Sequence, residues 1–168
     1  MRAAQSYAKR FGWPVFPLHE TNPDGVCSCG SPDCHSPAKH PRTPNGLKDA
    51  TTDPATIQDW WSKWPTANIG IRTGKESGLL VLDVDSGGED TLQDLQREIG
   101  PLPNTVEQHT GSGGRHLVFR HPGTEIRNSA GRLGRGLDVR GDGGYFIAAP
   151  SRNASGAYVW ELSSRPGD

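Results

Sequence analysis

The sequence has no long hydrophobic run, and apolar residues make up only 32% of its 168 residues. No segment approaches the roughly 20 apolar residues that a helix needs to cross a bilayer. The first residues also lack the apolar stretch of a secretion signal. These absences argue against a membrane protein and predict a cytoplasmic protein with a modest core. The 22 glycines and 14 prolines predict many turns and short elements instead of a helical bundle.

Cysteine is scarce, since the chain has three, and all of them fall in a segment rich in Pro, Gly, Ser and Asn, residues 21–46. In a reducing compartment, three cysteines favour a metal site over a disulfide framework. Three thiolates and one imidazole make a four-ligand set for structural zinc. The candidate ligands are Cys27, Cys29, Cys34 and His40.

The fourth zinc ligand has a competitor in His35. Because His35 directly follows Cys34, ligation of one tetrahedral ion by both side chains is awkward, and His40 is preferred. Cys-x-Cys is a tighter spacing than the common Cys-x-x-Cys, so a loop with free cysteines stays an alternative. A loop of this length with so little apolar content has few other ways to become ordered.

Net charge is also small, at −1, which argues against a generally basic coat for nucleic acid. The charges are unevenly placed, however. Residues 76–98 hold seven acids and one base, whereas residues 115–140 hold six arginines and two acids. A local basic strip of this kind can meet phosphates while the whole chain stays near neutral.

Hydrophobic periodicity and turn residues predict a mixed α+β chain. Helices are expected over 2–11, from Pro54 and over 88–99, with Asp53 capping the second helix and Leu92, Leu95 and Ile99 forming one stripe of the third. Strands are expected over 15–18, 68–73, 79–85, 106–110, 116–120, 137–140, 145–149 and 157–161. The order predicts a smaller N-terminal α/β layer followed by a sheet that is mainly antiparallel.

Two aspartates at the end of an apolar strand are the most informative local feature. The uncharged segment 78–82 leads into Asp83 and Asp85, whose i, i+2 spacing places both carboxylates on one strand face. Like charges this close repel unless a cation lies between them. Paired carboxylates at a strand end suit Mg²⁺ or Mn²⁺ that also holds phosphates. The alternative is a strand that runs into the polar turn 85–88.

A glycine-rich turn follows at residues 110–114 and leads into Arg115 and His116. Glycines let backbone N–H groups approach phosphate oxygens, and Ser112, Arg115 and His116 add further donors. The segment therefore predicts a phosphate-binding turn. An ordinary hairpin turn with an incidental histidine is the alternative.

A third carboxylate, Asp138, lies between Leu137 and Val139 on a later apolar strand and faces the side opposite to theirs. It can complete a three-carboxylate metal site. Arg140 shares its face and can either neutralise Asp138 or meet a phosphate. An internal Asp138–Arg140 surface pair is the alternative.

Taken together, an Asp-x-Asp strand, a Ser-x-x-x-His turn and strand, and an aspartate on a later strand resemble the archaeo-eukaryotic primase superfamily. Within it, the chain looks like the bifunctional primase–polymerase (prim-pol) branch found in phages, plasmids and bacteria. The resemblance covers nearly the whole chain. Further matching segments are 12–18, 39–41, 50–53, 60–61, 67–71 and 144–151.

The resemblance implies a two-lobed fold with an RRM-like catalytic sheet and a zinc-binding insertion over residues 21–46. Residues 1–168 would be one catalytic domain of a longer chain, of the kind that can also carry a helicase. A phage-encoded protein would act in the cytoplasm of a bacterial host. The implied substrates and partners are a single-stranded DNA template, a primer terminus and nucleoside triphosphates.

The resemblance also implies roles for individual residues in template-directed nucleotide transfer. Asp83, Asp85 and Asp138 would hold the catalytic Mg²⁺ or Mn²⁺ ions, and His116, with Ser112 and Arg115, would bind the triphosphate. Weaker candidates for nucleotide contacts are Arg140, Asn68 and Thr73. Two rivals remain: a zinc-bearing nucleic-acid-binding module without catalysis and a metal-dependent nuclease. The carboxylates disfavour the first rival, since they would repel DNA without metals, and the phosphate-binding turn disfavours the second.

Overall fold

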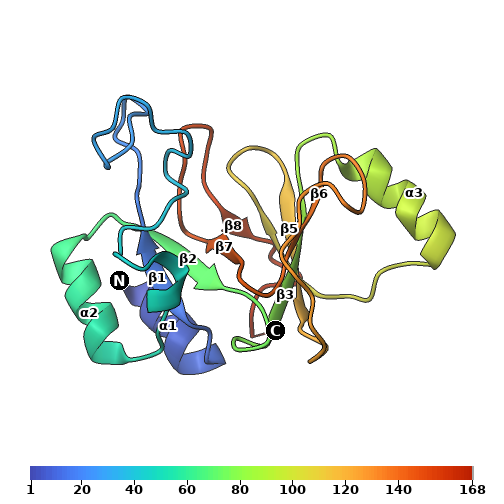
Figure 1. Ribbon diagram of the computed structural model, residues 1–168, viewed down its shortest axis with the longest axis horizontal. Coiled ribbons are helices and arrows are strands. Elements are labelled where there is room, and N and C mark those ends of the chain that lie inside the picture. The colour runs from blue at the N-terminus through green and yellow to red at the C-terminus, as the bar shows by residue number, and fades with distance from the viewer. Residues whose placement is uncertain (168) are drawn as a thin grey trace. The chain divides into compact units, whose positions relative to one another are not determined.

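The computed structural model describes residues 1–167, which form a mixed α/β protein with two antiparallel sheets (Figure 1). The chain divides into two compact units, and each unit is built from two separate stretches of sequence. The first unit contains residues 1–72 and 145–158, and the second contains residues 73–144 and the segment from Val159 onward. Within the described residues, no helix has the length and apolar character needed to span a bilayer.

The first unit holds a three-stranded sheet with β2 between β1 and β7. Its elements are α1 (Arg2–Phe11), β1 (Val15–Leu18), the 3₁₀ helix η1 (Gly46–Asp49), α2 (Pro54–Lys63), β2 (Asn68–Arg72) and β7 (Tyr145–Ala148). The start of α2 confirms its sequence prediction, because the Asp53 carboxylate accepts the N–H of Thr56 at 2.7 Å and Pro54 occupies the first helical position. The position of β7 in this sheet was not foreseen from the sequence.

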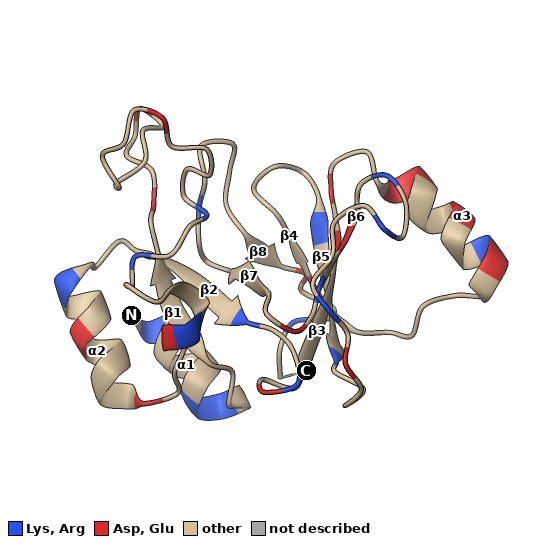
Figure 2. Cartoon of the chain, in the orientation of Figure 1, with Lys and Arg blue, Asp and Glu red and all other residues tan. Residues whose placement is uncertain are grey.

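The second unit holds a five-stranded antiparallel sheet in the order β6-β3-β5-β4-β8, together with one helix. Its elements are β3 (Leu79–Val84), α3 (Glu89–Ile99), β4 (Val106–His109), β5 (Arg115–Arg120), β6 (Leu137–Arg140) and β8 (Val159–Trp160). These bounds agree with the predicted helix and strands to within a few residues. Acidic residues are concentrated on α3, as Figure 2 shows.

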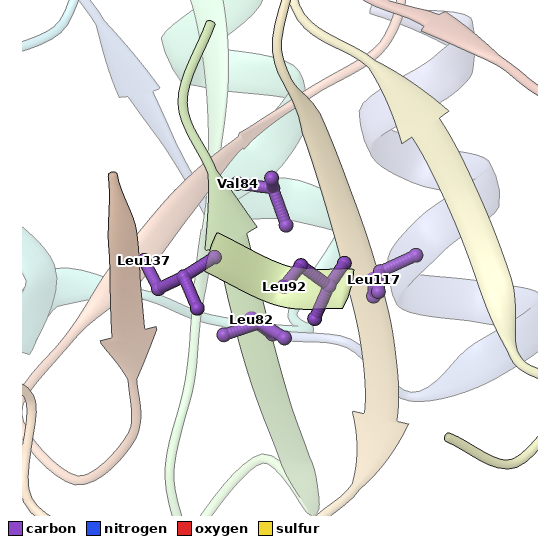
Figure 3. Close-up of a cluster of buried hydrophobic side chains, with 5 residues drawn as sticks. All are labelled: Leu82, Val84, Leu92, Leu117 and Leu137. Atoms are coloured by element: carbon purple, nitrogen blue, oxygen red, sulfur yellow. The ribbon is translucent and has the colours of Figure 1, made fainter. Parts of the chain in front are cut away.

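One face of the five-stranded sheet packs its apolar side chains against α3 (Figure 3). The buried cluster consists of Leu82, Val84, Leu92, Leu117 and Leu137. Leu95 packs against this cluster as the predicted helix stripe requires, but Ile99 does not, because it lies in the last turn of α3 and is 64% exposed. Since side chains alternate along a strand, this packing fixes which residues the sheet presents on its other face.

Candidate functional site

The opposite face of the five-stranded sheet carries a row of polar residues at one level of the ladder. Asp83 on β3 is the cross-strand partner of Asp138 on β6 and of His116 on β5. The register continues the row through Gln108 on β4 to Trp160 on β8. Strand pairing alone therefore places Asp138 and His116 on either side of Asp83, with Gln108 beyond His116.

Arg140 and His116 both contact the carboxylate of Asp83. One oxygen of Asp83, Oδ1, lies 3.3 Å from Nε2 of His116, and the other, Oδ2, accepts a hydrogen bond from Nη2 of Arg140 at 2.8 Å. The same Nη2 atom donates to Oδ2 of Asp138 at 2.9 Å. A single guanidinium nitrogen thus bridges the two carboxylates.

The pKa of Asp83 responds to two opposing influences. Burial, the larger single influence, raises the pKa of this carboxyl group, but hydrogen bonds and charge attraction from His116 and Arg140 together hold it at about 2. Asp83 is therefore ionised throughout the physiological range.

Asp85 lies just beyond the end of β3 and is exposed. Its backbone N–H donates to the carbonyl of Gly136 at 2.9 Å, and its negative charge helps to raise the pKa of Arg140 against the lowering effect of burial. Within residues 1–167, the carboxylates of Asp83, Asp85 and Asp138 are not gathered into one close group of three.

The residues nevertheless fit a hard divalent cation. Asp83 and Asp138 aim one oxygen each at the same positively charged atom of Arg140, so the pair already converges on a cation. Carboxylate oxygens are the donors that Mg²⁺ and Mn²⁺ prefer. The sequence analysis expected repulsion between Asp83 and Asp85, whereas the structure brings Asp83 close to Asp138 on the neighbouring strand, and Arg140 offsets the repulsion between these two.

Gln108 is a site residue that sequence reasoning missed. It is completely buried, and its Nε2 lies 2.7 Å from Nδ1 of His116. An amide N–H that donates to Nδ1 places the imidazole proton on Nε2, the nitrogen that faces Asp83. Gln108 thus orients His116 toward the carboxylates, and no local sequence signal marks it.

Replacing Gln108 by leucine is expected to remove this orientation while keeping the side chain's volume. We expect the ring-nitrogen chemical shifts of His116 in ¹⁵N NMR to change to those of a mixed tautomer. Loss of one buried hydrogen bond, about 1–3 kcal/mol, should weaken any activity that depends on His116. The matched control is Gln93→Leu on the exposed face of α3, which should leave His116 unchanged. Unaltered His116 shifts in the Gln108 variant would contradict this role.

The glycine-rich turn lies between β4 and β5, with Ser112 exposed at its tip. The turn is closed by the N–H of Gly114, which donates to Oγ1 of Thr110 at 3.0 Å. A Cβ atom at position 114 would come within 2.3 Å of the carbonyl oxygen of Val84, so only glycine allows β5 to start this close to the end of β3.

The sequence analysis grouped the side chain of Arg115 with that of His116, but the structure places the two side chains on opposite faces of the sheet. Adjacent residues on a strand face opposite sides of the sheet, and Arg115 is the cross-strand partner of Val84 on the α3 face. There it pairs with Glu89 at 2.6 Å and with Glu107 at 3.2 Å. Its donors are therefore directed at these two carboxylates and away from the row that contains Asp83.

Asn68 and Thr73 have the contacts of structural residues. Both side chains are buried, and Nδ2 of Asn68 donates to the carbonyls of Ala38 and Arg152 at 3.0 and 2.6 Å. Oγ1 of Thr73 donates to the carbonyl of Gly141 at 2.8 Å. These hydrogen bonds hold loops in place, and neither residue lies in the row around Asp83.

The loop over residues 21–46 brings together the four predicted zinc ligands. One ligand atom from each of Cys27, Cys29, Cys34 and His40 lies within 4.8 Å of all the others. Nε2 of His40 is 3.3 Å from Sγ of Cys27 and 3.5 Å from Sγ of Cys34. His35, the competing ligand, is exposed and lies outside this group.

The acidity of the Cys27 thiol and the arrangement of the four side chains suit a metal ion that prefers sulfur ligands. Burial raises the pKa of the Cys27 thiol, but hydrogen bonds from the Cys29 and Ala38 backbone and from His40 together lower it to about 6. The ring of His19 stacks on His40 with 4.4 Å between centroids. Three sulfur atoms and one imidazole nitrogen at these distances can hold a zinc ion.

Paired carboxylates can hold divalent metal ions, and such ions can in turn bind phosphate groups. The family model for the N-terminal domain of bifunctional DNA primase/polymerases, Prim-Pol, matches residues 4–168. The chain belongs to this family, which links it to DNA primase and polymerase activity. No curated protein matches the chain.

Proposed function

We propose that this chain is a template-directed nucleotidyltransferase that adds nucleotides to a primer on a single-stranded DNA template. The observation that carries the proposal is the row Asp138–Asp83–His116 in a chain of the Prim-Pol family. The sheet that bears this row would be the RRM-like catalytic sheet of a two-lobed primase fold.

The reaction would be attack of a primer 3′-hydroxyl on the α-phosphate of a bound triphosphate, with pyrophosphate leaving. Divalent metals held by Asp83, Asp85 and Asp138 would supply charge neutralisation on the phosphates and acidity for the attacking hydroxyl. Asp83 contributes a full negative charge at neutral pH, because its pKa is about 2. Asp138 lies opposite Asp83 across the ladder, and Asp85 extends the set past the strand end.

Two further side chains would bind the triphosphate. His116 presents its Nε2 N–H on the carboxylate side, where it can donate to a phosphate oxygen. Arg140 contacts Asp83 and Asp138. With these carboxylates holding divalent metals, its guanidinium would be available to a phosphate group, for which its forked donors are well suited. The Ser112 turn is a further phosphate candidate.

The Cys₃His group would hold a structural zinc ion that orders residues 21–46. This proposal is supported by the four convergent ligand atoms and by the low pKa of Cys27. The zinc would not take part in nucleotide transfer, since four protein ligands leave no open coordination position.

Primer extension tests the proposal. A 5′-labelled primer on a longer DNA template is incubated with the chain, Mg²⁺ or Mn²⁺, and dNTPs or NTPs. We expect the primer to lengthen by template-matched nucleotides. Shortening of the primer would indicate the metal-dependent nuclease, and binding without any change in length would indicate the zinc-bearing nucleic-acid-binding module.

A further inference from the structure

The six arginines between residues 115 and 140 do not form one uniform basic strip. Arg115, Arg127 and Arg140 form ion pairs with nearby carboxylates. In the described part of the chain, Arg120, the last residue of β5, forms none, and neither do Arg132 and Arg135, which are both exposed. These two positive charges lie on the loop between β5 and β6, which carries several basic residues in Figure 2.

We propose that the loop 129–136, here called the basic loop, binds the phosphate backbone of the nucleic-acid strand on which the site acts. The proposal rests on the proposed function, because it assigns a partner to a surface beside the same carboxylates. The basic loop has the sequence Ser-Ala-Gly-Arg-Leu-Gly-Arg-Gly. Leu133, between the two arginines, is 44% exposed and offers an apolar contact for a base or sugar.

The basic loop is tied to the candidate site at both of its ends. The N–H of Gly131 donates to Oδ1 of Asp138 at 2.8 Å, and the carbonyl of Gly136 accepts the N–H of Asp85 at 2.9 Å. Ser129 also exchanges two backbone hydrogen bonds of 2.9 Å with Val139 of β6. A strand bound along the basic loop would therefore pass next to two of the three candidate metal ligands.

The conformation of the basic loop is set by its backbone. The N–H of Gly134 donates to the carbonyl of Gly131 at 3.3 Å and closes a turn around Arg132 and Leu133. Gly134 has φ of +132°, and a Cβ atom there would come within 2.4 Å of Cγ2 of Thr91 on α3. The loop is thus held against α3, which lowers the entropy lost when its arginines engage phosphates.

The chemistry of the exposed groups favours a phosphodiester backbone over a free triphosphate. Arg132 and Arg135 flank an exposed leucine, so the basic loop combines donors for phosphate oxygens with an apolar side chain for a base or sugar, groups that a free triphosphate tail lacks. Arg140 and His116 already supply donors for a triphosphate at the carboxylates. The basic loop adds positive charge outside that row.

The test replaces both arginines by glutamine, Arg132→Gln with Arg135→Gln, in the 168-residue chain. Binding of a labelled single-stranded DNA is measured over a range of salt concentrations, without added nucleotide or divalent metal. We expect affinity to fall roughly tenfold and the slope of log K against log [salt] to fall by about 1.4, since each phosphate contact on a single strand contributes about 0.7.

The matched control removes the same charge elsewhere, with Arg97→Gln and Arg120→Gln. Arg97 is on α3 and Arg120 is the cross-strand partner of Leu79, four ladder positions from Asp83. This control should keep nearly the full affinity and slope. Triphosphate affinity, measured separately with Mn²⁺, should be the same in the loop variant as in the unmodified chain.

Three results would overturn the proposal: absence of DNA binding by the unmodified chain at low salt, equal losses in the loop and control variants, or an equal loss of triphosphate affinity in the loop variant. Failure of the proposed function would look different. Salt-sensitive DNA binding that depends on Arg132 and Arg135, without any primer extension, would support the basic loop and refute the polymerase.

Discussion

Replacing Asp83 and Asp138 by asparagine is expected to abolish nucleotide addition by this chain. The change removes both carboxylates that converge on one nitrogen of Arg140 and with them the proposed anchor for divalent cations. Metal ions contribute several kcal/mol of charge stabilisation in such reactions, so the rate should fall by at least about 10³-fold. Single-turnover primer extension with saturating Mn²⁺ measures this loss.

The fold of the double variant should survive. Asparagine keeps an oxygen that can accept hydrogen bonds from Arg140, and Asp83 lies on the face of the sheet opposite the leucine cluster. Circular dichroism and thermal melting test this point. The matched control, Asp59→Asn with Asp94→Asn, makes the same change of charge at exposed positions and should extend primers normally. Extension at near-normal rate by the Asp83 and Asp138 variant would refute the metal assignment.

Loss of zinc is expected to have a large effect on the order of the loop over residues 21–46. Purified protein should contain about one zinc ion per chain, and Cys27→Ser should lose it, because this buried thiol is one of the four convergent ligand groups. Structural zinc contributes roughly 10–16 kcal/mol to the folding of small zinc domains. Elemental analysis and hydrogen exchange measure the outcome, with protection lost over residues 21–46 and kept in β3 and β5.

The zinc experiment has its control within the same loop. His35 is exposed and outside the ligand group, so His35→Ala should keep both the metal and the protection pattern. Residual anchoring is also expected in the Cys27 variant, because the carbonyls of Ala38 and Lys39 accept hydrogen bonds from Asn68 and Tyr145. A metal-free unmodified protein with a fully protected loop would show that the cluster is not a zinc site.

Local patterns in the sequence predicted most elements because their causes are local. Residue spacing predicts the apolar residues of β3 and the place of His40 among the candidate zinc ligands. Capping preferences predict the start of α2 at Asp53 and Pro54. The zinc ligands could be grouped from the sequence because all four fall within a stretch of 14 residues, 27–40.

Features that depend on strand pairing could not be predicted in this way. Gln108 reaches His116 only through the β4–β5 register, and nothing in its neighbours marks it as part of a site. Arg115 was placed beside His116 because the two are adjacent in sequence, although adjacency on a strand puts them on opposite faces. Arg140 was correctly placed on the face of Asp138, but its bridge to Asp83 depends on the pairing of β6 with β3.

The interleaved composition of the two units has a consequence for synthesis of the chain on the ribosome. One edge of the central strand β2 stays unpaired until β7 is synthesised, about 75 residues later in the chain. Until then, the N–H and C=O groups of this edge are open to pairing with other chains. The nascent protein is therefore most prone to aggregation between completion of β2 and arrival of β7, and a chaperone or slow translation would have its largest effect in that interval.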